Sequence, residues 1–171
     1  MALPHKLKAF QLFVDGGGWI NEVPSLTLPE LSRNLTAYQG GGMAGPVQVD
    51  LGQEEIEFSW TTPTMRKEAF ATYASPEHDA AQLRFEGSYE SDEDGSTLPV
   101  RVTAHGRYAS IGSTEASAGE DNEGSEWTMT ASYYKLEIDG SAVIEIDMVA
   151  GTVIVNGEDR TAQRRQNIGM I

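Results

Sequence analysis

Residues 127–148 read WTMTASYYKLEIDGSAVIEIDM and carry the pattern that decides the fold class. Apolar and polar side chains alternate from Trp127 to Tyr133, which predicts a strand with one buried face that continues to Ile138. The dipeptide Asp139-Gly140 follows, and both residue types tolerate the positive φ angles of a tight hairpin turn. Residues 143–148 then predict the returning strand. This stretch therefore indicates an antiparallel β protein.

The same alternation recurs upstream in shorter segments. These half-buried strands are predicted at residues 47–51, 56–60, 83–89 and 100–104. The parity of the apolar positions changes across residues 52–55, so a bulge or turn is expected there. Asp15-Gly16, which precedes Trp19, predicts a second hairpin near the N-terminus. Together these segments predict a chain that is mainly β.

Two segments predict helices. In the first, Thr64 is the expected N-cap, and the apolar stripe consists of Met65, Ala69, Phe70 and Tyr73. The second spans residues 158–166 and complements the helix dipole, with the acids Glu158 and Asp159 first and Arg164 and Arg165 last. Residues 39–45, which include three consecutive glycines, and residues 113–125 predict loops. The pattern is therefore β-rich α+β.

Composition narrows the possible classes of function and the expected location of the protein. The 171 residues suit one domain spanning residues 1–171. The 26 acidic and 12 basic residues give a formal net charge of -14, so stable binding to nucleic acid or to an anionic membrane is not expected. The absence of cysteine excludes disulfides and thiol catalysis. The apolar run at residues 9–14 is too short for a signal peptide or a membrane span, which predicts synthesis in the cytoplasm.

No constellation of residues indicates catalysis. An EF-hand loop starting at Glu90 would have ligands at Asp92 and Asp94 and its glycine at Gly95, but Arg101 stands where the bidentate Glu is required. We therefore expect a solvated acidic turn, with a looser calcium site as the alternative. The histidines His5, His78 and His105 lack metal-ligand spacing. The sequence predicts no enzyme activity, no cofactor and no metal.

Four aromatic residues leave a binding module open as another class of function. They lie on alternating strands with aliphatic neighbours and are Trp60, Trp127, Tyr133 and Tyr134. Packing in the core or at a subunit interface is the favoured interpretation. The alternative is a ligand platform on a soluble β-sandwich module that binds carbohydrate or calcium.

A series of short motifs resembles the major tail tube proteins of P2-like contractile phages and of R-type pyocins. The motifs are LFVDG (12–16), SLTLP (25–29), YQGGGM (38–43), VQVDLG (47–52), RFEGS (84–88), SYYKLEIDG (132–140), EID (145–147) and VNGEDR (155–160). Their order and spacing hold over nearly the full length of the chain. Residues 61–82 match the family in predicted helical character more than in residue identity, and residues 113–126 depart from the family pattern.

The resemblance implies a fold and an assembly. The expected fold is two antiparallel sheets packed as a barrel-like sandwich, with a flanking helix and an extended inter-subunit loop. Six copies would close a ring through strand pairing, and the rings would stack into a hollow tube. A contractile sheath, a baseplate or tube initiator and a terminator are the implied partners. The implied location is a virion tail or a tailocin particle that penetrates the host envelope, with DNA or ions passing through the lumen.

Two sets of residues are candidates for roles in this assembly. The inter-ring or inter-subunit loop would contain Tyr38, Gly40, Gly41, Gly42, Met43 and Pro46. The candidate lumen acids, which alternate with buried positions and would repel DNA, are Glu55, Glu57, Glu86 and Glu90. A tube subunit of type VI secretion, which shares the tube fold, is a further alternative.

Overall fold

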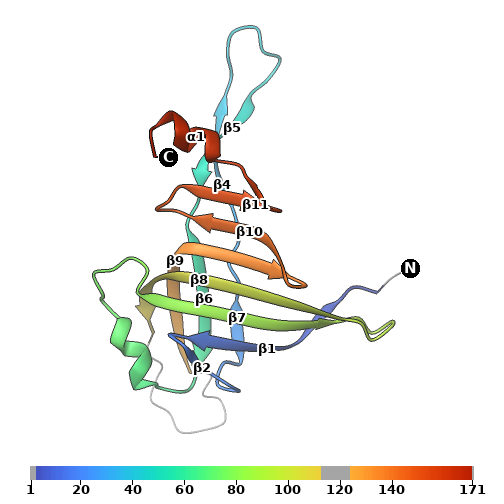
Figure 1. Cartoon of the computed structure of the whole chain (residues 1–171), viewed down its shortest axis with the longest axis vertical. Coiled ribbons are helices and arrows are strands. Elements are labelled where there is room, and N and C mark those ends of the chain that lie inside the picture. Colours follow the sequence, from blue (N-terminus) through green and yellow to red (C-terminus); the bar gives the residue numbers. More distant parts are fainter. Residues whose placement is uncertain (1–2, 113–123, 171) are drawn as a thin grey trace.

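The computed structural model describes residues 3–112 and 124–170, and nearly all of its regular structure is strand (Figure 1). The first six strands are β1 (Lys6–Val14), β2 (Gly17–Gly18), β3 (Ser25–Thr27), β4 (Arg33–Tyr38), β5 (Val47–Gln53) and β6 (Ile56–Thr62). The others are β7 (Ala81–Glu90), β8 (Thr97–Ile111), β9 (Ser125–Ile138), β10 (Ser141–Asp147), β11 (Thr152–Val155) and β12 (Glu158–Asp159). The helical segments are the 3-10 helix η1 (Lys67–Thr72) and α1 (Ala162–Asn167).

Ten of these strands form one antiparallel sheet that branches at β9. Its main path runs β12-β11-β10-β9-β8-β7-β1-β2, and β6 joins β9 to β3 off this path. The first half of β9, residues 125–131, pairs with β6, whereas residues 133–138 pair with β10. β4 and β5 form a separate two-stranded sheet. The prediction of a mainly β, antiparallel fold is therefore confirmed.

The two predicted hairpins are present. Asp15 and Gly16 connect β1 to β2 with φ angles of 50° and 80°, and Asp139 and Gly140 connect β9 to β10 with 51° and 75°. Both turns therefore use the positive φ angles that favour Asp-Gly.

A bulge in β9 corrects one prediction about its buried face. Trp127, Met129 and Ala131 point inward as expected, but Tyr134 is the next buried residue, not Tyr133. The register explains the change, because Ala131 pairs with Gly106 and Tyr133 with His105, which leaves Ser132 as an extra residue. A Cβ at Gly106 would lie 1.9 Å from the Thr130 carbonyl oxygen, so glycine is required where the bulge brings the strands together.

The core is centred on aromatic side chains from β6, β8 and β9. Trp60 and Trp127 stack with ring centroids 6.1 Å apart, and Trp19 meets Trp127 edge-on at 5.4 Å. Tyr108 packs against both Trp60 and Trp127. The indole nitrogens of Trp60 and Trp127 have no hydrogen-bond partner among the described residues, so these two side chains contribute through packing. The aromatic platform proposed as a ligand site therefore lies mostly in the core.

Both helix predictions are only partly right. The 3-10 helix η1 starts three residues after Thr64, and its apolar stripe is largely solvent-exposed apart from Ala69. In the second segment Glu158 and Asp159 form the edge strand β12, and α1 begins at Ala162. Short segments with thin apolar stripes gain too little from burial to extend a helix.

Candidate assembly surface

The β4–β5 hairpin projects beyond the main sheet and contacts little of it (Figure 1). All six residues of β4 and the first five of β5 are exposed. The prediction of a strand at residues 47–51 is confirmed, but the expectation that it is half-buried is wrong. An isolated two-stranded hairpin is at best marginally stable in water, so this element needs a partner surface.

The exposed hairpin has apolar side chains on both faces, although Gln48 and Asp50 make the second face partly polar. Cross-strand register places Tyr38 opposite Val47 and Thr36 opposite Val49 on one face. Leu35, opposite Asp50, lies on the other face. Tyr38 and Leu35 are 60% and 53% exposed, so the hairpin presents large apolar side chains to solvent on both sides.

The tip of the hairpin holds the candidate inter-subunit loop. Its glycine run is ordered by a turn in which the Met43 amide donates to the Gly40 carbonyl at 3.2 Å, while the Gly40 amide faces the Met43 sulfur at 3.0 Å. Gly42 adopts a φ of +88°, which favours glycine. Gly41 has open space around it, and Pro46 is exposed just before β5 begins. The loop is thus a compact turn at the end of a long arm.

An ion pair fixes the base of the hairpin. The Arg33 guanidinium donates to the Asp50 carboxylate at 2.9 Å, and the Gly52 amide donates to the same carboxylate. These contacts, first of all the bond from Arg33, hold the pKa of Asp50 below its ordinary value. Gly52 has a φ of +138° beside the shift in register between Asn34 and Leu35, so the predicted irregularity after Leu51 is present. The arm therefore leaves the sheet in a defined direction.

The four candidate lumen acids lie next to buried positions of β6 and β7. Glu55 and Glu57 flank the buried Ile56, while Glu86 and Glu90 alternate with inward positions of β7. Glu86 is not free, because Arg84 and Arg101 lie 3.3 and 3.0 Å from its carboxylate. Glu90 lies opposite Lys6 in the register of β1 and β7.

Strand register shows that Glu57 and Glu86 lie on the same outer face of the sheet. Glu57 is opposite Thr130, which is in turn opposite Arg107 of β8. Glu86 is opposite Arg101 of the same strand. Arg101 and Arg107 are six residues apart and therefore point to one side. Basic residues thus interrupt the acidic face, which the acidic alternation alone did not reveal.

The acidic turn between β7 and β8 is organised by its own contacts. Asp92 accepts a hydrogen bond from the Lys8 ammonium at 2.8 Å, and Asp94 accepts from the Ser96 amide and hydroxyl. Glu93 accepts from the Leu3 amide at 2.7 Å. Across residues 3–112 and 124–170, no cluster of three or more His, Asp or Glu side chains could hold a metal ion.

The three histidines lie in unrelated places. His5 contacts the Ser96 hydroxyl, His78 contacts the Ser132 hydroxyl, and the His105 ring packs on Tyr133 with centroids 5.2 Å apart. Each therefore has a local structural contact.

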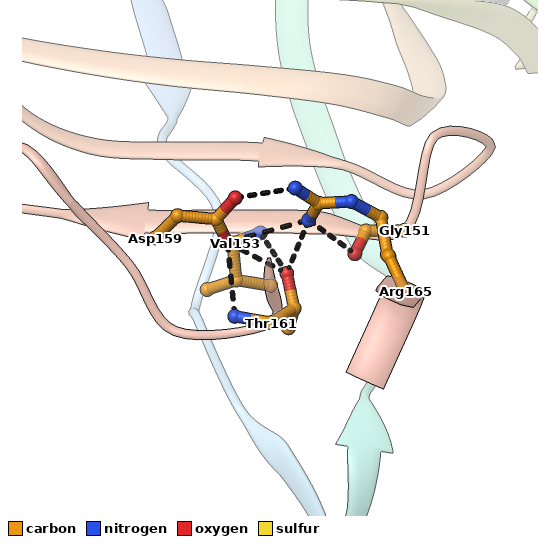
Figure 2. Close-up of polar contacts among 5 residues, drawn as sticks. All are labelled: Gly151, Val153, Asp159, Thr161 and Arg165. Carbon is orange, nitrogen blue, oxygen red and sulfur yellow. Dashed lines mark hydrogen bonds and ion pairs between the residues drawn. The ribbon is translucent and has the colours of Figure 1, made fainter. Parts of the chain in front are cut away.

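The C-terminal helix is attached by the polar cluster drawn in Figure 2. The Arg165 guanidinium donates to both oxygens of Asp159, to the Thr161 hydroxyl at 2.8 Å and to the Gly151 carbonyl. The Thr161 hydroxyl also accepts the Val153 amide of β11 at 3.1 Å. The bond from Arg165, followed by that from the Thr161 amide, lowers the pKa of Asp159. No residue of α1 is buried, so this cluster, and not apolar packing, holds the helix against the sheet.

Sequence reasoning missed two parts of this surface. Strand β4 was not predicted, although residues 33–38 mirror the exposed β5 with which they pair. The sequence prediction used Arg164 and Arg165 only for the helix dipole and Arg160 only as part of the VNGEDR motif, and it assigned no binding role to Arg160, Arg164 or Arg165. Their density within six residues of an acidic chain was the available signal.

Comparison with known proteins identifies the family. The chain matches the profile of phage tail tube protein FII over residues 4–169. It is 38% identical over 173 residues to the tail tube protein of Escherichia phage P2, covering 99% of this chain and 100% of that protein. The chain belongs to the phage tail tube family. It is a structural tail tube subunit and not an enzyme.

Other relatives agree with this membership. The major tail tube protein of Serratia phage KSP20 is 37% identical over 151 residues, covering 87% of this chain and 86% of that protein. Phage tail tube proteins are components of the virion tail. The described residues include no helix long and apolar enough to span a membrane.

Solved structures share the fold of this tail tube family member. The sheath/tube terminator of the extracellular contractile injection system PVC, in its extended state, superposes with a TM-score of 0.57 at 13% identity, covering 78% of this chain and 96% of that chain. The PVC sheath-tube complex gives a TM-score of 0.57 at 14% identity, covering 78% of this chain and 91% of that chain. The likeness thus extends to injection systems outside phages.

Proposed function

We propose that six copies of this chain close into a ring and that the rings stack into a hollow tube through the β4–β5 hairpin. The observation that carries the proposal is the exposure of an apolar arm that the chain itself leaves uncovered. Such an arm has a marginal stability alone and gains from burial against a neighbouring copy. The loop from Tyr38 to Pro46 then reaches the next subunit or ring.

The tube would be enclosed by a contractile sheath and bounded by initiator and terminator proteins. It would be assembled in the host cytoplasm and driven through the target envelope, with DNA or ions passing along the lumen. The outer sheet face that contains Glu55, Glu57, Glu86 and Glu90 would line this lumen. Because Arg84 and Arg101 neutralise Glu86, Glu55 and Glu57 would contribute most to repelling DNA.

Negative-stain microscopy of the purified protein tests the assembly directly. We expect rings and tubes at high protein concentration and the same protein in intact tails. Persistent monomers under all conditions, together with absence of the protein from tails, would overturn the proposal.

Deleting residues 40–43 tests the role of the loop. The deletion should abolish stacking while circular dichroism shows a folded monomer, because these residues make no contact with the core. Gly41→Ala is the matched control, since it keeps the loop length and adds a methyl group where nothing lies within 4 Å. Tubes of unchanged length from the deletion variant would contradict the assigned role.

A further inference from the structure

Positive charge gathers around one groove in a chain whose net charge is -14. The groove has a volume of about 400 Å³ and lies between the base of the β4–β5 hairpin, β10, β11 and the start of α1. Arg33, Arg160 and Arg164 line it, and Asp50 is the one carboxylate among its lining residues. We call this feature the arginine groove.

The positive charge of the arginine groove is only partly compensated. Arg33 is paired with Asp50, and Arg160 lies 3.1 Å from the exposed carboxylate of Glu158. Arg164 has no ion-pair partner in the described parts of the chain, although it is near enough to Asp50 to help lower the pKa of that carboxyl. The groove thus keeps at least one exposed guanidinium free for a carboxylate of another molecule.

The position of Arg164 is set by its neighbour in sequence. Arg165 is fixed by Asp159, Thr161 and the Gly151 carbonyl (Figure 2), which orients the short helix on the sheet. Arg164 is exposed on the same helix and lines the groove. A guanidinium on an anchored helix loses less freedom on binding than one on a loose loop.

The floor of the groove is apolar. It is lined by Leu31, Ile144, Ile146, Val153 and Val155. Only Ile146 is fully buried, so the others keep exposed surface that a partner could cover. An apolar floor with a cationic rim excludes water from the ion pairs formed above it, which strengthens them.

We propose that the arginine groove receives the acidic β7–β8 turn, residues 91–96, of a second copy of this chain. The inference rests on the self-assembly proposed above and names two surfaces that meet in it. Copies with a charge of -14 repel one another, so a stable contact is favoured where a positive surface of one copy faces a negative surface of the next.

The β7–β8 turn suits this role because it is acidic, protruding and ordered. Asp92, Glu93 and Asp94 are consecutive and exposed, and only Asp92 has a cationic partner among the described residues. The Gly95 amide donates to the Ser91 carbonyl at 3.0 Å, so the turn is already formed before binding. Figure 1 shows it at the far end of β7 and β8, away from α1.

The two surfaces are different parts of the molecule, so the contact between copies is head-to-tail. A head-to-tail contact repeats from copy to copy and closes into a ring when the rotation allows it. The arginine groove and the β7–β8 turn would then be buried at every contact within a ring.

Charge reversal and its rescue test this pairing. Arg164→Glu and Glu93→Lys should each raise the critical concentration for assembly at least about tenfold, because each places like charges together. The double variant restores the attraction between neighbouring copies and should return to within about threefold of the wild type. Arg107→Glu is the matched control, since Arg107 is also exposed and unpaired with any described carboxylate but lies outside the groove.

Cross-linking provides a second measurement that does not depend on affinity. The chain has no cysteine, so Arg164→Cys combined with Glu93→Cys introduces one defined pair. Oxidation of assembled protein should give a ladder of covalent oligomers, whereas Arg107→Cys combined with Glu93→Cys should remain monomeric on a denaturing gel.

The outcomes separate this inference from the proposed function. If the wild type forms tubes and both charge reversals form them equally well, without a ladder, the groove pairing is wrong and the tube proposal stands. If Arg164→Glu spares the tube but abolishes binding of a sheath protein or an oligonucleotide, the occupant is another macromolecule and the pairing is again wrong. A wild type that never self-associates overturns both proposals.

Discussion

Residues 47–51 and residues 56–60 carry the same alternation of apolar and polar side chains and are separated by four positions. In β6, Ile56, Phe58 and Trp60 are all at most 1% exposed. In β5, Val47 and Val49 are 49% and 42% exposed. One pattern therefore has two outcomes within a single stretch of chain.

The difference lies in what covers each strand. β6 pairs with β9 and with β3, and its inner face meets the tryptophans of the core. β5 pairs only with β4, in a separate two-stranded sheet that has an irregularity at Gly52. Alternation predicts that one face of a strand will be buried, but it does not predict whether the surface that covers this face belongs to the same chain.

The largest effect on the folded monomer is expected at the buried strand. Trp60→Ala should lower the free energy of unfolding by about 3–5 kcal/mol, because it leaves a cavity between Trp19, Tyr108 and Trp127. Urea denaturation followed by fluorescence or circular dichroism measures the loss. A change below about 1 kcal/mol would show that the cluster does not hold the core.

Trp60→Phe is the control for this prediction. It keeps an aromatic ring and removes an indole N–H that has no acceptor among the described residues, so no polar partner is left behind. The loss of stability should be clearly smaller than for alanine. An equal loss would mean that the indole nitrogen has a polar role.

Local rules explain why much of the sheet could be predicted. The turns at Asp15-Gly16 and Asp139-Gly140 follow from residues that accept positive φ, and the strands beside them follow from alternation. The bulge at Ser132 could not be predicted in the same way. It depends on the register against β8 and on the space beside Gly106, which are contacts between distant segments.

The C-terminal helix α1 is held by a polar cluster instead of apolar burial. We expect that breaking this cluster has an effect on the monomer between those at β6 and at β5. The folded pKa of Asp159 is below its ordinary value of 3.8, so its ion pair with Arg165 stabilises the helix fully above that pH. The contribution decreases progressively as the pH falls from about 4 through the lowered pKa of the folded state, where the carboxylate is protonated. Hydrogen exchange should therefore show α1 opening in acid before the strands of the core.

Arg165→Gln separates this ion pair from general acid effects. The variant lacks the cation, so its helix should exchange rapidly at neutral pH and change little on acidification. Helix protection in the wild type that stays constant from about pH 6 down to about pH 2 would contradict the assignment.

The candidate surface was less predictable than the fold because it, like the bulge at Ser132, depends on contacts between distant segments. The candidate loop at residues 38–43 could be proposed from a family resemblance. The arginine groove could not, because it is built from residues 31–53, 144–155 and 160–164. Only folding brings these segments together. The interrupted acidic face likewise emerged only once strand register placed Arg101 opposite Glu86.

The smallest effect on the monomer is expected at the exposed strand. Val49→Lys should change the free energy of unfolding by less than about 1 kcal/mol, because the side chain has no core contact to lose. The same change should prevent assembly, since it places a charge on an apolar face that we propose is buried between copies. Denaturation and sedimentation of one preparation measure the two effects.

Leu35→Lys identifies the face of the hairpin that docks, because Leu35 lies on the side opposite to Val49. If both faces are buried between copies, both variants should stay monomeric. If one face remains in solvent, only one variant should lose assembly. Normal tubes from both variants would show that the exposed arm has no role in assembly. A large loss of monomer stability in Val49→Lys would instead mean that β5 is covered by its own chain, and the contrast with β6 would then disappear.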